Sequence, residues 1–229
     1  MYRLREVSKQ FVAHGRTISA LNHVSMDIFP GEFLAVQGPT GQGKTTLLTL
    51  LGALDRPDTG EVLYQGRDLS KLSDEALTEL RARDIGFVFQ TFNLIATLNA
   101  QENVEAALVP LDIDARDREE RASEALAAMG LSSRAQHLPM ELSGGQQQRV
   151  AIARAIVKEP QVLLADEPTG NLDEETRAEI LDVLMALWRE RGITLVIVTH
   201  DSSVARQASR VVTIRNGMVF AKHDLTARS

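Results

Sequence analysis

The chain contains no cysteine, no long apolar run and no excess of positive charge, and each absence excludes a class of protein. Without cysteine among the 229 residues, disulfides and thiolate metal sites are impossible, although the redox compartment stays open. No apolar run approaches the roughly 20 residues that a membrane-spanning helix needs. The start, Met1-Tyr2-Arg3-Leu4-Arg5-Glu6, lacks the apolar core of a secretory signal. We therefore expect a soluble chain that can still dock on a membrane protein.

The net charge of −6 argues against broad nucleic-acid binding, because such binding needs a basic surface that displaces counterions. A local basic patch is still compatible with this charge. The hydrophobic share of 44% and the charged share of 24% are ordinary for a globular protein. The length suits one large domain, or a core that carries an inserted subdomain.

A glycine-rich stretch between an apolar strand and a helix is the most informative feature of the sequence. Glycines let successive N–H groups point at phosphate oxygens, and the start of the following helix adds its positive dipole end. Lys44 supplies a charge for the β- and γ-phosphates, and Thr45 supplies a hydroxyl for Mg²⁺. A plain glycine turn needs neither, so the pattern predicts a nucleoside triphosphate site and a cytosolic chain. The nucleotide-binding residues are expected to be Gly38, Pro39, Thr40, Gly41, Gln42, Gly43, Lys44, Thr45 and Thr46.

Hydrophobic periodicity and turn residues predict a mixed α/β chain. The expected strands are 7–12, 24–28, 32–36, 60–66, 85–89, 161–166 and 193–198, with a closing hairpin of 211–214 and 218–220 joined through Asn216-Gly217. Turns are expected at Gly15 and Pro30-Gly31, and the last residues, 225–229, are expected to fray. Ser73 is placed to cap a helix over 74–83, and a second helix over 174–191 is expected to bury Trp188. From 91 to 157 the pattern is helical, which predicts a helical insertion into an α/β core.

Two further segments carry chemistry. Asp166-Glu167 ends an apolar strand, where Asp166 can hold the Mg²⁺ shell and Glu167 can accept a proton from an attacking water. An acidic turn after a strand is common, so this pair indicates a catalytic site only in combination with the phosphate loop. Ser143-Gly144-Gly145-Gln146 opens an apolar helix and offers N–H groups to an anion. Ser143 can equally be an ordinary N-cap, and spacing alone does not separate these alternatives.

Together these segments resemble the ATP-binding subunit of an ATP-binding-cassette (ABC) transporter over nearly the whole chain. Residues 38–45 match Walker A, 162–166 match Walker B with Glu167 as the catalytic glutamate, and 142–146 resemble the signature motif. The remaining matches are the Q-loop at Gln90, the D-loop at Asn171-Leu172-Asp173, the switch histidine at His200 and the adenine-stacking aromatic at Phe11.

The resemblance implies an ABC-type P-loop NTPase with a RecA-like core. In that fold, residues 1–90 and 158–229 form the core with an N-terminal antiparallel β-subdomain, and residues 91–157 form the inserted α-helical subdomain, within one domain of 1–229. The family pairs head to tail, so the signature residues Ser143, Gly144, Gly145 and Gln146 would contact the ATP of a second copy. Glu167, His200 and Gln90 would be catalytic, while Thr45, Gln90 and Asp166 would hold Mg²⁺. Phe11 would stack on adenine, although a phenylalanine in an amphipathic strand can also belong to the core.

The segments 54–61, 85–94, 98–104 and 165–173 resemble the lipoprotein-release and macrolide-export branch. That branch implies ATP-driven mechanotransmission to an integral membrane permease, with this chain at the cytoplasmic face of the membrane. Phe92 and Leu94 would grip a helix of that permease, or would simply pack the subdomain. The alternatives are a cell-division-type ATPase that signals through a membrane partner, an ABC-type ATPase acting on DNA or ribosomes, and a nucleotide-binding module without turnover.

Overall fold

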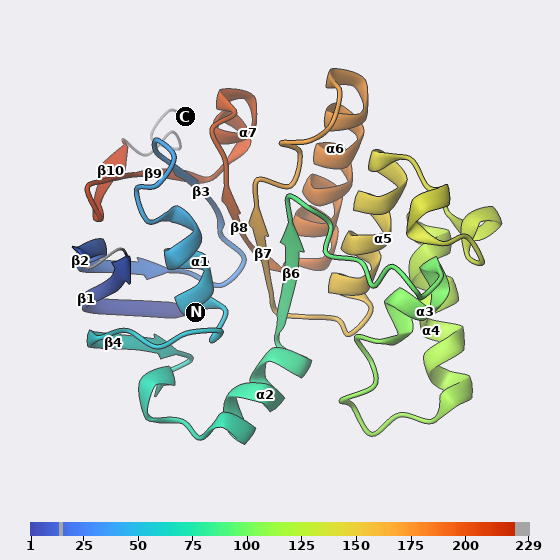
Figure 1. Ribbon diagram of the computed structural model, residues 1–229, viewed down its shortest axis with the longest axis horizontal. Coiled ribbons are helices and arrows are strands. Elements are labelled where there is room, and N and C mark those ends of the chain that lie inside the picture. The colour runs from blue at the N-terminus through green and yellow to red at the C-terminus, as the bar shows by residue number, and fades with distance from the viewer. Residues whose placement is uncertain (14–15, 223–229) are drawn as a thin grey trace. The chain divides into compact units, whose positions relative to one another are not determined.

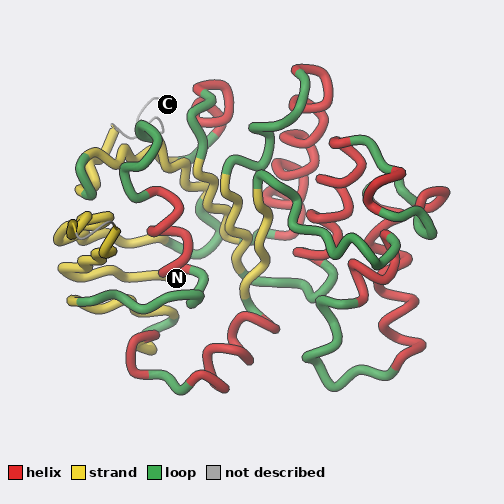
Figure 2. Tube along the Cα trace, viewed as in Figure 1, coloured by secondary structure: helices red, strands yellow, loops and turns green. Residues whose placement is uncertain are grey.

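The computed structural model describes residues 1–13 and 16–222, which form two compact units. The first unit takes its described residues from 1–77 and 194–222, and the second is Thr78–Ile193. The turn expected at Gly15 and the frayed end expected at 225–229 lie outside the described residues. Figure 1 labels the elements of both units, and Figure 2 separates their helices from their strands by colour.

The first unit contains an antiparallel sheet in the order β2-β1-β4-β5. Its strands are β1 (Tyr2–Ala13), β2 (Arg16–Ile28), β4 (Thr59–Tyr64) and β5 (Arg67–Asp68). Both N-terminal strands are confirmed, but each is longer than the alternating pattern predicted. The pairing of β1 with β2 shifts register between Leu4 and Val7, and Glu6 there has a φ of 50°. Such an irregularity interrupts the alternation on which the prediction depended.

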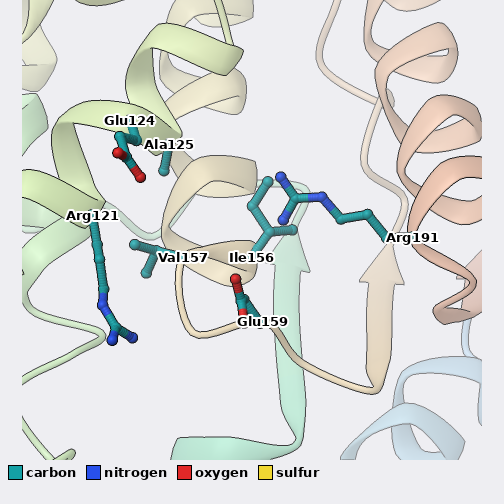
Figure 3. A pocket seen from close by; sticks show the side chains of 7 residues that line it. All are labelled: Arg121, Glu124, Ala125, Ile156, Val157, Glu159 and Arg191. Atoms are coloured by element: carbon teal, nitrogen blue, oxygen red, sulfur yellow. The ribbon is translucent and has the colours of Figure 1, made fainter.

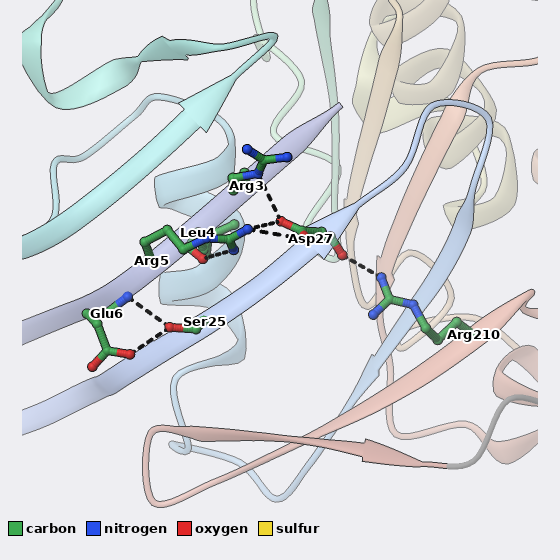
Figure 4. Close-up of polar contacts among 7 residues, drawn as sticks. All are labelled: Arg3, Leu4, Arg5, Glu6, Ser25, Asp27 and Arg210. Carbon is green, nitrogen blue, oxygen red and sulfur yellow. Dashed lines mark hydrogen bonds and ion pairs between the residues drawn. The ribbon is translucent and has the colours of Figure 1, made fainter.

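A cluster of charged groups fastens this sheet to the other sheet of the same unit, as Figure 4 shows. The carboxylate of Asp27 on β2 lies 2.9 Å from the guanidinium of Arg5 and 3.5 Å from that of Arg3. Arg210, at the start of β9 (Arg210–Arg215), donates to the backbone oxygen of Asp27 at 2.6 Å and to Glu32 at 2.6 Å. The end of β2 is therefore held by Arg3 and Arg5 of its own sheet and by Arg210 of the other sheet.

The other strands of the first unit run in the order β10-β9-β3-β8. They are β3 (Phe33–Gln37), β8 (Thr194–Val198), β9 and β10 (Met218–Lys222), and β3 is parallel to both β8 and β9. The predicted hairpin between β9 and β10 is confirmed, with φ values of 51° at Asn216 and 72° at Gly217. Two helices, α1 (Lys44–Leu51) and α7 (Ser202–Gln207), complete the unit. Fully buried side chains of its core include Leu4, Phe33, Leu47, Leu51 and Tyr64.

The second unit is built on one parallel pair of strands, β6 (Ile85–Phe89) and β7 (Val162–Asp166). Its helices are α3 (Ala100–Glu105), α4 (Ala115–Ala128), α5 (Gly144–Ile156) and α6 (Glu174–Arg191), with short 3₁₀ turns at Ser132–Arg134 and Pro139–Glu141. A further 3₁₀ turn, Leu69–Lys71, leads to α2 (Asp74–Arg83), along which the chain passes from the first unit to the second, and Ser73 caps α2 as predicted. Residues 91–157 contain helices and turns but no strand, as predicted (Figure 2).

The burial of α6 differs from expectation at its C-terminal end. Trp188 is only half-buried, against the prediction, because it lies in the last turn of α6, where the neighbouring Arg189 guanidinium lies 6.0 Å from its ring. Met185 takes the buried place one turn earlier. Among the described residues, no helix combines the length and the apolar character that crossing a bilayer requires.

Candidate functional site

The glycine-rich loop between β3 and α1 has backbone that only glycine can adopt at two positions. Gly38 has a φ of 151°, and a Cβ there would lie 2.3 Å from the oxygen of Ile214. Gly43 has a φ of 99°, and a Cβ there would lie 2.0 Å from the oxygen of Ala20. Both contacts are with backbone, which cannot move aside as a side-chain end can. The loop is thus seated directly on β2 and on the β9–β10 hairpin.

Lys44 is the first residue of α1 and is 6% exposed. Its ammonium group donates to the backbone oxygens of Gly38 and Pro39 at 2.9 and 3.0 Å. The lysine therefore reaches back across the base of the loop, so that its charge lies inside the ring of backbone. The N-cap residue, Gly43, has no side chain that could accept a hydrogen bond from the N–H groups in the first turn of α1. Thr45, which lies in that turn, is exposed. This combination of a helix start and a loop lysine is suited to an anion with several oxygens.

The hairpin turn braces the loop from a position that is distant in sequence. The side-chain oxygen of Gln42 accepts a hydrogen bond from the backbone N–H of Asn216 at 2.5 Å. The next residue, Gly217, accepts from the N–H of Asn22 at 2.9 Å. These bonds fix the loop's outer side against β2 and the β9–β10 hairpin within one unit.

His200 follows β8, the strand next to β3. The N–H of Thr199 donates to the oxygen of Val36 at 3.1 Å, so the two parallel strands end together. The phosphate loop and His200 therefore leave the same edge of one sheet, which is where ligands of open α/β sheets bind. His200 is exposed, and Asp201 caps the following helix α7.

Phe11 lies on β1 and is 44% exposed, so the alternative that it belongs to the core is wrong. The ammonium of Lys9 lies 5.5 Å from the centre of its ring and is held by Asp55 at 2.9 Å. Burial alone would lower the pKa of Lys9, but the hydrogen bond to Asp55 and the carboxylates of Asp55 and Asp58 raise it overall. Lys9 therefore stays charged beside an exposed aromatic ring.

The second unit brings together the acidic pair and Gln90 in the same manner. Phe89 pairs with Asp166 across the parallel strands β6 and β7, so that Gln90 and Glu167 both directly follow the strand ends. Glu167 is half-buried and has a φ of 46°, which is a strained conformation for a residue with a Cβ.

The side chain of Gln90 is fixed by Asn171. Gln90 donates through Nε2 to Oδ1 of Asn171 at 3.0 Å, and Asn171 donates through Nδ2 to the backbone oxygen of Gln90 at 3.0 Å. A Cβ at Gly170 would lie 2.8 Å from Nε2 of Gln90, so that glycine provides the space for this pair. The loops after β6 and β7 are thereby joined by a reciprocal amide pair.

The signature segment opens α5, and its first turn lies against the first turn of α6. Ser143 accepts from the N–H of Gln146 at 3.3 Å, and the side chain of Gln146 accepts from the N–H of Ser143 at 3.0 Å. The N-cap interpretation of Ser143 is therefore confirmed, while its hydroxyl stays on an exposed residue. Gly145 is buried, and a Cβ there would lie 2.3 Å from Cγ2 of Thr176.

The D-loop residue Asp173 is the N-cap of α6, the helix against which the signature segment lies. It accepts from the N–H of Thr176 at 2.9 Å and from its hydroxyl at 2.8 Å. These backbone and side-chain bonds hold the pKa of the Asp173 carboxyl below its usual range. Asp173 is exposed, so its other side is open to solvent or to a partner.

Two residues of α5 that we did not predict support these loops. Arg154 donates to the backbone oxygens of Asn93 and Phe92 at 2.7 and 2.8 Å, and burial lowers the pKa of its guanidinium. Phe92 and Asn93 both have positive φ values, 61° and 49°. Gln148 is fully buried and donates to the oxygen of Pro168 at 2.5 Å. Repeated glutamines and arginines in the sequence give no sign of which of them points inward.

A separate pocket of about 310 Å³ lies in the second unit (Figure 3). It is lined by Arg121, Glu124, Ala125, Ile156, Val157, Glu159 and Arg191. None of these lining residues is a predicted site residue, so the pocket is distinct from the loops described above.

Comparisons with known proteins agree with this geometry. The family model described as ABC transporter matches residues 21–170. The chain is 45% identical to the lipoprotein-releasing system ATP-binding protein LolD of Syntrophus aciditrophicus, over 96% of this chain and 98% of that one. It is 42% identical to the macrolide export ATP-binding/permease protein MacB of Wolinella succinogenes, over all of this chain but only 35% of that protein.

A solved structure also matches along the whole of both chains. It is described as a dimeric post-hydrolysis state of the ATP-binding cassette MJ0796 bound to ADP and Pi, with a TM-score of 0.92 and 42% identity. The chain therefore belongs to the ABC transporter family, as an ATP-binding cassette with a P-loop α/β fold. It is an ATPase, which converts ATP and water to ADP and phosphate.

Proposed function

We propose that this ATPase powers a transporter or mechanotransmission complex of the lipoprotein-release and macrolide-export type. The observation that carries the proposal is the similarity to LolD, which extends over nearly the full length of both chains. The loops after β3, β6, β7 and β8 supply the residue types that binding and hydrolysis of ATP require. The division into a core, 1–90 and 158–229, and a helical subdomain, 91–157, is part of the proposal.

In this proposal the loop from Gly38 to Thr46 binds the phosphates, and Lys44 neutralises the β- and γ-phosphates. Phe11 provides the exposed ring on which adenine stacks, and the ammonium of Lys9 lies 5.5 Å from the centre of that ring. Support comes from the exposure of Phe11 and from the backbone shape of the loop. Arg or Lys residues at such loops act chiefly through charge and position.

The residues proposed to hold Mg²⁺ are Thr45, Gln90 and Asp166. Their hydroxyl, amide and carboxylate oxygens are the hard donors that this ion prefers. Asn171 engages the amide nitrogen of Gln90, so the amide oxygen is the atom that can face a cation. When bound, Mg²⁺ would neutralise charge on the phosphate oxygens.

Hydrolysis needs a base for the attacking water, and Glu167 is the proposed residue. Its carboxylate takes a proton from the water while the water oxygen attacks the γ-phosphorus and the bond to ADP breaks. His200 is proposed to contact the γ-phosphate and to orient the water, and Gln90 to respond to the occupied site. The strained backbone of Glu167 supports a functional rather than a structural role.

The proposed active form contains two copies of the chain. The start of α5, with the exposed Ser143 followed by Gly144, Gly145 and Gln146, would contact the γ-phosphate bound by Lys44 of the other copy, and Asp173 would lie at the same interface. A helix start offers N–H groups to an anion without needing a positive side chain. The dimeric state given for MJ0796 supports this arrangement.

The other proposed partner is an integral membrane permease, which would hold the chain at the cytoplasmic face of the membrane. Phe92 and Leu94 are half-buried and Ile95 is 46% exposed, so this turn offers apolar surface to a permease helix. The turn is stiffened by Arg154, which suits a segment that must transmit force. No nucleic acid partner is expected.

The Glu167→Gln variant tests the hydrolysis step. The amide cannot accept the proton, so we expect turnover to fall by roughly 10²–10⁴ while ATP binding persists. The variant should then accumulate as an ATP-bound dimer, measured by size-exclusion chromatography with and without ATP. Unchanged turnover would assign the base to another residue, and a variant that stays monomeric with ATP would contradict the paired site.

The alternative functions differ in what they bind. A cell-division-type ATPase would also purify with a membrane partner but would support no release or export of cargo in vesicles. An ATPase acting on DNA or ribosomes would purify with nucleic acid, against its net charge of −6. A binding module would bind ATP without releasing phosphate, whereas the family of this chain hydrolyses it.

A further inference from the structure

We infer that Gln148 is a positioning residue that holds the loop of Glu167 in its active conformation and links that loop to the signature segment. Gln148 lies on α5, five positions after Ser143, and its side chain is fully buried. Its Nε2 donates to the backbone oxygen of Pro168 at 2.5 Å. The inference rests on the proposed role of Glu167 as the base.

The contact acts on the residue that directly follows Glu167. A proline has a fixed φ, so holding its carbonyl oxygen also restricts the peptide that joins it to Glu167. Residues before proline favour extended backbone, whereas Glu167 has a φ of 46°. A conformation of this kind persists only where surrounding contacts impose it. Gln148 supplies such a contact from the helix that begins with the signature.

A packing role alone does not explain a glutamine at this place. The other atom of the amide, Oε1, is buried and has no hydrogen-bond partner among the described residues. Turning the amide over would set an oxygen against the oxygen of Pro168, which is repulsive. An orphaned acceptor is unfavourable in a core, so an apolar side chain would pack better. The donation to Pro168 is what an apolar side chain would lose.

The same helix holds the other catalytic loop through Arg154, and Gln90 and Asn171 join the two loops. Displacement of α5 at Ser143 would therefore reach Glu167 by one hydrogen bond. Contact of the signature with the ATP of the second copy would thus set the base in this copy's own site.

The test compares Gln148→Met with Gln101→Met in the full-length chain. Gln101 is also a buried glutamine, 8% exposed, and donates to the backbone oxygen of Glu119 at 2.8 Å and to Glu105 at 2.9 Å. Measurements are kcat for ATP hydrolysis, affinity for a fluorescent ATP analogue, and Tm. For Gln148→Met we expect kcat to fall about 10- to 100-fold, as for a misplaced catalytic group, with affinity and Tm retained. For Gln101→Met we expect a lower Tm with kcat retained below that Tm.

Retained kcat in Gln148→Met would overturn the inference, as would a loss of kcat that follows only from a Tm below the assay temperature. The Glu167→Gln variant, measured alongside, separates this failure from failure of the proposed function. If Glu167→Gln loses turnover and Gln148→Met does not, only the inference fails. If Glu167→Gln keeps full turnover, the proposed base itself is wrong.

Discussion

The contact between the starts of α5 and α6 leads to a prediction that depends on a single methyl group. Gly145 has ordinary helical backbone, so alanine is excluded there only by space. The new Cβ would lie 2.3 Å from Cγ2 of Thr176, which is far inside a normal contact. Thr176 cannot rotate away freely, because its hydroxyl donates to Asp173 at 2.8 Å in the cap of α6. Gly145→Ala therefore forces either the helix or the cap to move.

The expected magnitude is the difference of two opposing effects. Overpacking in a filled site costs about 1–3 kcal/mol, while alanine gains up to about 1 kcal/mol over glycine inside a helix. We expect a net loss of about 1 kcal/mol in the free energy of unfolding. For a chain of this size that lowers Tm by about 2–4 °C.

The decisive variant is Gly145→Ala combined with Thr176→Ser. Serine removes Cγ2 but keeps the hydroxyl that donates to Asp173, the N-cap of α6, so the double variant should recover the stability that Gly145→Ala loses. Urea denaturation of the four proteins gives the coupling energy, which we expect to be about 1–2 kcal/mol. Gly144→Ala is the control, since its Cβ would lie 3.4 Å from the Leu172 side chain, an ordinary contact. Two single changes that simply add within about 0.5 kcal/mol would refute the steric reasoning.

Three further predictions address binding, pairing and pH. Lys44→Ala should weaken ATP binding by about 100-fold, because it removes a charged donor from the loop; calorimetry that finds full affinity would contradict the loop assignment. Ser143→Arg should stop hydrolysis while the monomer still binds nucleotide, and an equal loss of monomer binding would argue against a site shared by two copies. Burial lowers the pKa of Lys158 to about 8, so the unfolded chain binds the extra proton between pH 8 and 10.5. The free energy of unfolding of the wild type, relative to that of Lys158→Met, should then rise with pH over this window by at most about 1.4 kcal/mol per pH unit. A difference between the two proteins that does not change with pH would contradict the lowered pKa of Lys158.

Local signals were enough to predict much of the fold. The strand, glycine loop and helix of residues 32–51 follow directly from apolar runs and helix-start chemistry, as does the hairpin at Asn216-Gly217. The end of α6 shows the limit of periodicity, since Trp188 continues the apolar stripe yet is half-buried at the last turn. Periodicity gives the face of a helix but not where the core beneath it ends.

The candidate site was predicted less completely, because its supports join segments that are distant in the sequence. Gln42 meets a turn 174 residues further along the chain, and Gln90 meets Asn171. Nothing local distinguishes Gln148 from its neighbours Gln146 and Gln147. The orientation of α5 in the folded chain turns Gln148 inward to Pro168 and leaves Gln146 and Gln147 half-buried.

The distribution of these residues between the two units implies that binding and turnover can be separated by mutation. The loop of Lys44 contacts Ile214, Ala20 and Asn216, which all belong to the first unit. The loop of Glu167 receives the hydrogen bond of Gln148 on α5 and is joined to Gln90 by the amide pair of Asn171, and all of these residues belong to the second unit. A change that loosens α5 should therefore reduce kcat without weakening nucleotide binding, whereas a change at the hairpin should act first on binding. Since the signature is the start of α5, engagement of a second copy would also reach the loop of Glu167 in this copy and so act on its turnover.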